Sequence, residues 1–129
     1  MPNHARLVFF ETFSSIAWFL MDSCWMAGFK APAHLLALPT LAAGAIAFWY
    51  AERTAANLFV TGAMNAWAFM NVFWMMHDLG TLKGGLVPAK VFGLAGLLCL
   101  IAALFIARSS RDALAKVLER FRRLRLKKL

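Results

Sequence analysis

The sequence predicts an all-α membrane protein with four transmembrane helices, arranged as two hairpins, followed by a basic amphipathic helix at the C-terminus. Three observations support this fold class. Apolar residues make up 62% of the 129 residues, only 16% are charged, and nine of the 14 Lys and Arg lie beyond Ala107. A soluble domain is only about half apolar and spreads its charges along the chain. This composition excludes a disordered chain, a disulfide-rich secreted domain and an ordinary water-soluble globule.

Four apolar segments are the predicted spans, at residues 7–29, 34–50, 55–79 and 88–107. A helix rises about 1.5 Å per residue, so about 20 residues cross a hydrocarbon core of about 30 Å. The segments show no alternation with a period of two, and lipid offers the backbone no hydrogen-bond partner, so we expect helices. Short polar turns separate them, at 30–32, at 52–54 and at 80–88, where Gly84 and Gly85 lie. We expect the first segment to be a retained span, because it is too long for a signal peptide.

The last segment, residues 109–129, is predicted to form a separate helix on the membrane surface. Ser109 or Ser110 can cap it, and apolar residues recur from Leu114 to Leu124 at helical spacing. Residues 108–129 carry a net charge of +7 out of the total of +8. We therefore expect it to bind anionic lipid headgroups or a partner protein. We expect it to bind no nucleic acid, because no folded nucleic-acid-binding domain accompanies the basic residues. The binding residues would be Lys116, Arg120, Arg122, Arg123, Arg125, Lys127 and Lys128.

The same charge asymmetry predicts the orientation of the chain. Lys and Arg favour the cytoplasmic side of a membrane, and this tail dominates the count. Four spans then place both termini and the turn at Glu52 and Arg53 in the cytoplasm, with Lys30 and Lys83 on the other side. We expect a bacterial inner-membrane protein with a bundle at residues 1–108 and a cytoplasmic helix at 109–129.

An internal repeat relates the first and third segments. Residues 17–26 match residues 66–75 at an offset of 49, with five identities in ten positions. The identities include two tryptophan pairs, and Asp22 corresponds to its near-isostere Asn71. The offset equals one hairpin, so the predicted repeat units are residues 7–53 and 55–107. Two such units would be related by an axis along the membrane normal.

Aromatic residues define one face of each repeated helix. Trp18 and Trp25 are seven residues apart on the first helix, and Trp67 and Trp74 are seven residues apart on the third. The two members of each pair therefore share a face, and we expect the two faces to meet across the axis.

Polar residues inside the spans are the candidate site. Glu11 and Asp22 are eleven residues apart, about three helical turns, and therefore share the tryptophan face of the first helix. Asn71 and Asp78 share the corresponding face of the third helix, whereas Asn65 is expected to point elsewhere. An acidic residue within a span costs about 3 kcal/mol on insertion scales, so such residues are candidates for function.

A structural interpretation of the same residues stays open. Glu11 lies about a turn inside the predicted cytoplasmic boundary and could extend its carboxyl to that boundary, or pair with Arg53 or Arg108. Asp22 and Asn71 could hydrogen-bond to each other, an interaction that holds membrane helices together at about 1 kcal/mol. We expect no metal and no cofactor, because no metal-ligand spacing or nucleotide loop is present.

Three function classes remain from the sequence, and a membrane-embedded enzyme or metal carrier is the least supported of them. The first is a non-enzymatic accessory, assembly or scaffold module that docks through its Trp-rich face or its basic tail, to a membrane-protein partner or to further copies of itself. The second is a small proton-coupled transporter with Glu11 or Asp22 as the titrating carboxylate. No grouping of Ser, His and Asp or other enzyme signature occurs, so we expect no catalytic activity.

Overall fold

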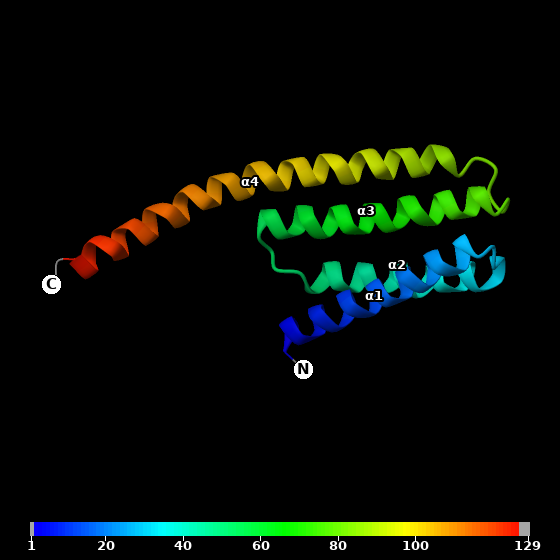
Figure 1. Cartoon of the computed structure of the whole chain (residues 1–129), viewed down its shortest axis with the longest axis horizontal. Helices are drawn as coiled ribbons and strands as arrows, with labels where there is room; N and C mark the ends of the chain where they lie inside the picture. The colour runs from blue at the N-terminus through cyan, green and yellow to red at the C-terminus, as the bar shows by residue number, and fades with distance from the viewer. Residues whose placement is uncertain (1, 127–129) are drawn as a thin grey trace.

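The computed structural model consists of four helices that run up and down in chain order (Figure 1). They are α1 (Asn3–Met26), α2 (Lys30–Tyr50), α3 (Ala55–Asp78) and α4 (Leu86–Leu126). The structure describes residues 2–126, with side chains described up to Arg108. All four helices are long and apolar enough to span a membrane, and the span within α4 covers Leu86–Arg108. The prediction of an all-α chain with four such helices is confirmed.

The helix ends follow from local sequence. Gly28 and Gly80 have φ angles of 76° and 74°, the left-handed conformation that ends a helix and that glycine adopts without strain. α1 therefore ends three residues before its predicted end, and α3 ends one residue before its predicted end. The Thr54 side chain accepts a hydrogen bond from the Asn57 backbone N–H and caps the start of α3. α2 begins four residues earlier than predicted, because Pro32 is tolerated in a first turn.

The last helix differs from the prediction. α4 continues without interruption from Leu86 to Leu126, so no helix boundary occurs at Ser109 (Figure 1). The predicted cap is not used because the sequence beyond Gly96 contains neither glycine nor proline and is rich in Ala, Leu, Arg and Lys, which favour helix. The side chains of the basic tail, and residues 127–129, lie outside the described part of the chain.

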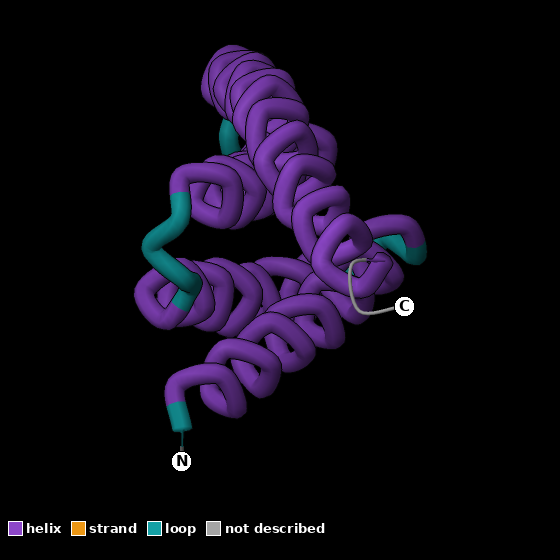
Figure 2. Tube along the Cα trace, turned by 90° about the vertical axis from the view of Figure 1, so that its left-hand side faces the viewer, coloured by secondary structure: helices purple, strands orange, loops and turns teal. Residues whose placement is uncertain are grey.

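The two hairpins share a core at one end of the bundle. α1 packs along α2 and α3 packs along α4, while α2 and α3 form the smaller contact between the hairpins (Figure 2). The buried residues that join them are Met21, Ala33, Ala37, Val72 and Met75. These residues lie toward the turns at 27–29 and 79–85, and we call this end of the bundle the core end. The opposite end, which we call the open end, carries the N-terminus and the turn at 51–54.

The repeat-related residues do not occupy equivalent places. Met21 and Met75 are fully buried, but their counterparts are not: Met70 is half-buried and Met26 is 87% exposed. The packing within the hairpins is therefore not symmetrical at these positions, although α1 and α3 run in the same direction.

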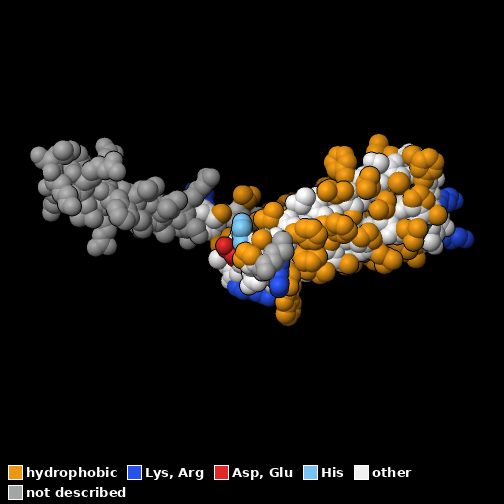
Figure 3. Space-filling view, turned by 90° about the horizontal axis from the view of Figure 1, so that it is seen from below, with side chains coloured by type: hydrophobic (Ala, Val, Ile, Leu, Met, Phe, Trp, Pro, Cys, Tyr) orange, Lys and Arg blue, Asp and Glu red, His pale blue; other side chains and the backbone are white. Residues whose placement is uncertain are grey.

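The surface matches a lipid environment. Apolar side chains cover the length of the bundle, and charged side chains gather at its two ends (Figure 3). Leu35, Leu94 and Leu104 are among the large apolar residues that are more than half exposed. In water this exposure would be costly, whereas in a bilayer it places apolar side chains against lipid.

Candidate functional site

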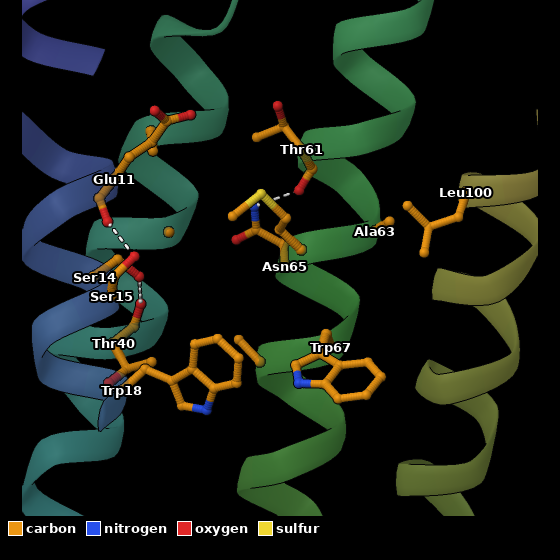
Figure 4. Close-up of a pocket in the computed structure, with 14 residues that line it drawn as sticks. Glu11, Ser14, Ser15, Trp18, Thr40, Thr61, Ala63, Asn65, Trp67 and Leu100 are labelled. Atoms are coloured by element: carbon orange, nitrogen blue, oxygen red, sulfur yellow. Dashed lines mark hydrogen bonds between the residues drawn. The ribbon is translucent and has the colours of Figure 1, made fainter. Parts of the chain in front are cut away.

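A cleft of about 230 Å³ lies between α1 and α3, with α2 also contributing to its wall (Figure 4). It starts near the middle of the helices and extends toward the open end, away from the shared core. Its walls are mostly apolar or small, with a few polar groups among them. The lining residues are Glu11, Ser14, Ser15, Trp18, Thr40, Gly44, Ala47, Thr61, Ala63, Met64, Asn65, Trp67, Ala68 and Leu100.

Helical spacing brings these side chains to one place. On α2, Thr40, Gly44 and Ala47 follow each other at intervals of four and three residues and therefore share one face. The lining residues of α1 from Glu11 to Trp18, and those of α3 from Thr61 to Ala68, follow the same periodicity. Each helix thus contributes about two turns to the cleft.

Hydrogen bonds satisfy most of the polar groups in the cleft. Ser14 Oγ donates to the Thr40 backbone oxygen at 2.9 Å, and this bond ties α1 to α2. Ser15 Oγ donates instead to the Glu11 backbone oxygen of its own helix, at 2.8 Å. Thr40 Oγ1 likewise donates to the Leu36 backbone oxygen at 2.8 Å. The hydroxyl groups of Ser14, Ser15 and Thr40 are therefore engaged by backbone oxygens, which is how such residues are accommodated within membrane spans.

Asn65 and Gly44 form a close contact across the wall of the cleft. Asn65 Nδ2 donates to the Thr61 backbone oxygen at 2.9 Å, which fixes the amide. A Cβ atom built on Gly44 would lie 2.8 Å from Asn65 Oδ1, closer than real contacts allow. The absence of a side chain at Gly44 therefore lets the Asn65 amide approach α2.

Glu11 is half-buried in the wall of the cleft and has no ion-pair partner among the described side chains. The pairing with Arg53 or Arg108 suggested by the sequence is not formed. The Arg53 guanidinium instead lies over the Trp49 ring, 5.7 Å from its centroid, and donates to the Trp49 backbone oxygen. Glu11 thus presents an unneutralised carboxyl group to the cleft.

Asp22 lies outside the cleft. Its Oδ1 atom is buried without a hydrogen-bond partner, and so is Nε1 of Trp18, which stands one turn earlier on α1. Asn71 is buried on α3, but no hydrogen bond from it reaches Asp22 Oδ1 among the described residues. Asp78 is exposed at the last position of α3. The structure therefore does not combine the four predicted polar residues into one site.

The tryptophan faces meet at the core end and remain apart in the cleft. Trp25 and Trp74 contact each other edge to face, with ring centroids 6.0 Å apart. Trp18 and Trp67 both line the cleft, where their indoles lie at the same level on α1 and α3 (Figure 4). Trp67 is 51% exposed, so the Trp face is not closed by the chain's own packing.

Sequence reasoning missed Thr40 and Asn65 as site residues. Asn65 was expected to point away because it does not share a stripe with Asn71, yet it faces the cleft. The overlooked signal is depth: Ser14, Thr40 and Asn65 each fall near the middle of their spans, so up-and-down helices bring them to the same level.

The polar groups of the site include one carboxyl, one amide and four hydroxyls, and the hydroxyls of Ser14, Ser15 and Thr40 donate to backbone oxygens. Among the residues that the structure describes, no group of three or more His, Cys, Asp or Glu is placed to hold a metal ion.

Comparison with known proteins identifies no relative of this chain. No family model, no curated protein and no solved structure matches the chain.

Proposed function

We propose that this chain is a non-enzymatic accessory or assembly module of the bacterial inner membrane that docks a transmembrane segment of a partner protein in the cleft between α1 and α3. The observation that carries the proposal is the incomplete contact between the two hairpins. They share a core at one end, while the other half leaves a cleft with Trp18 and Trp67 in its walls. An additional helix would complete the bundle on this side.

The composition of the cleft supports a helix as the docked element. Eight of the 14 lining residues are Gly, Ala, Ser or Thr; Thr40, Ala47, Thr61 and Ala63 are buried, and Ser14, Ser15, Gly44 and Ala68 are accessible. Small residues allow the backbones of two membrane helices to approach closely, which is how such helices associate in lipid. Tryptophan adds large contact areas at protein interfaces and is common among the residues that dominate binding energy. The cleft thus combines small residues, against which a helix can pack closely, with two large tryptophan side chains.

The remaining sequence features fit this proposal. The Lys and Arg bias supports an orientation with both termini in the cytoplasm, where the tail from Lys116 to Lys128 would bind anionic headgroups or the same partner. The internal repeat suggests that the two hairpins arose by duplication and then diverged in packing.

Site-specific photocrosslinking in cells tests the proposal. A photoreactive amino acid is placed at Trp67 in the cleft or, as a matched control, at Leu97 on the surface of α4. The two positions are equally exposed, at 51% and 54%. We expect discrete protein adducts from position 67 and none beyond lipid adducts from position 97. Equal behaviour at the two positions would count against docking at the cleft.

The second candidate is a small proton-coupled transporter with Glu11 as the titrating carboxylate. It is favoured by the position of Glu11 in the wall of a cleft that reaches the middle of the span, without an ion-pair partner. The carboxyl infrared band of Glu11, assigned with Glu11→Gln in nanodiscs, distinguishes the two functions. A transporter requires this band to respond reversibly to the pH of the bulk solution, and an unresponsive band would exclude that role for Glu11.

A further inference from the structure

Glu11 is the one ionisable side chain among the residues that line the cleft. It stands beside small and aromatic residues, and its carboxylate oxygens accept no hydrogen bond from any described residue. The Asn65 amide oxygen, on the facing helix, is likewise without a donor among the described side chains. The cleft therefore presents acceptors from two helices and no cation of its own.

The depth of Glu11 makes this arrangement costly in an empty cleft. Glu11 lies eight residues beyond Asn3, about 12 Å along a helix of about 36 Å. Glu11 therefore lies about two helical turns inside the open end of α1. Acidic residues inside membrane spans pair with a basic residue or face water, because lipid does not solvate their charge. Occupation of the cleft by a cationic group would remove this cost.

We infer that the segment docked in the cleft is a transmembrane helix of a different protein that carries a Lys or Arg at the depth of Glu11. This inference rests on the proposed docking function and specifies the chemistry of the partner. A lysine ammonium has three hydrogen-bond donors and an arginine guanidinium five, and either group supplies the cation that Glu11 lacks among the described residues. Such a buried pair adds selectivity, because a helix without a basic residue would leave the carboxylate unpaired.

A second copy of this chain does not supply that residue. Within the four spans the basic residues are Arg6, Lys30, Lys90 and Arg108, and each lies near a span end. Lys30 and Lys90 stand at the core end, away from the cleft. Arg6 is engaged with Tyr50: its guanidinium donates to the phenolic oxygen and lies over the ring, 5.7 Å from the centroid. Arg108 stands at the very end of its span, so the described spans hold no free basic residue at the depth of Glu11.

The test uses two synthetic membrane-spanning peptides and the full-length protein in zwitterionic vesicles. Both peptides are leucine-rich helices with a dansyl group; one carries a single Lys at the depth of Glu11, and the other has Leu there. Energy transfer from the protein's tryptophans reports association. We expect the Lys peptide to bind about tenfold more tightly than the Leu peptide, within the range of polar interactions between membrane helices. The net charge of +8 on the protein opposes this preference, so a general electrostatic attraction would not produce it.

Three variants locate the effect. Glu11→Gln should abolish the preference for Lys, while Glu52→Gln should retain it, because Glu52 is an exposed carboxylate in the 51–54 turn that accepts from Asn57. Ala68→Leu, which fills the cleft but keeps Glu11, should weaken binding of both peptides. Circular dichroism and thermal unfolding of each variant establish that it is folded.

The outcomes separate this inference from the proposed function. Equal binding of the two peptides to the wild type, or a Lys preference that persists in Glu11→Gln, overturns the basic-residue inference. Docking itself would still stand if position 67 gives protein adducts in cells. If Glu11→Gln instead dissociates an oligomer of this chain in sedimentation experiments, the occupant is a second copy and the inference is wrong.

Discussion

At the residue scale, two adjacent serines of α1 make different hydrogen bonds and should differ in their effect on stability. Ser14 Oγ donates to the Thr40 backbone oxygen of α2, whereas Ser15 Oγ donates to the Glu11 backbone oxygen of its own helix. Ser14→Ala should lower the free energy of unfolding by about 1 kcal/mol, the value of a polar contact between membrane helices. Ser15→Ala should leave it nearly unchanged. Unfolding in mixed micelles, followed by tryptophan fluorescence, measures both, and equal losses would contradict the assignment.

Individual site residues were only partly predictable. Glu11 was identified because an acidic residue stands out in an apolar span, whatever its neighbours are. Asn65 was misplaced, because the stripe of α3 was assumed to face α1 along its whole length. The helices face each other over part of their length only, and that geometry depends on the packing at Met21 and Met75, which no local pattern encodes.

At the element scale, the tight start of α4 depends on Gly85. A Cβ atom at this position would lie 2.5 Å from the Phe73 backbone oxygen and 3.1 Å from the Cβ atom of His77, so α3 would have to shift. Gly85→Ala should destabilise the protein by about 1–3 kcal/mol, the usual cost of overpacking. The neighbouring Gly84 has no atom within 4 Å of such a Cβ, and Gly84→Ala should stay within about 0.5 kcal/mol of the wild type. Thermal unfolding of the two variants compares them directly, and a harmless Gly85→Ala would refute the close approach.

The helices themselves were predictable from hydropathy and from the polar, Gly and Pro residues of the turns. A membrane span needs a certain length of apolar residues, and lipid offers the backbone no hydrogen-bond partner outside the helix. Their ends were predicted less accurately: α1 ends three residues before its predicted end, near Gly28, and α2 begins four residues before its predicted start, at Lys30. The single large error concerns α4, where a cap signal at Ser109 was outweighed by a continuous run of helix-forming residues.

At the scale of the whole molecule, the contact between Trp25 and Trp74 should hold the hairpins together at the core end. Trp74 and Trp67 are similarly exposed, at 45% and 51%, but only Trp74 makes an edge-to-face contact with a tryptophan of the other hairpin. Trp74→Ala should therefore cost at least ~1 kcal/mol more than Trp67→Ala, because it removes an aromatic pair as well as apolar contact. Equilibrium unfolding gives the difference in free energy. Equal costs would mean that the hairpins are held elsewhere.

The open side of the bundle could not be predicted from the sequence, because it results from a difference between two similar hairpins. The repeat suggested symmetrical faces, yet Met75 is buried while its counterpart Met26 points outward. Small residues at Gly44 and Ala63 reveal a place for close approach, but they do not say whether a helix of the same chain occupies it. Only the arrangement of all four helices shows that Asn65 takes the approach at Gly44 and that Gly96 of α4 packs against Ala63.

The orientation in the membrane is the last property at this scale, and it depends on the tail. Arg6, Arg53 and nine tail residues are basic at the open end, against Lys30, Lys83 and Lys90 at the core end. Reporter domains fused to the two termini should therefore both be cytoplasmic. Replacing the tail's basic residues with Gln leaves two against three, so the variant should insert in both orientations, which protease protection of the reporters would reveal. A tail-neutral variant that keeps one orientation would show that the spans, rather than the tail, decide on which side of the membrane the cleft opens.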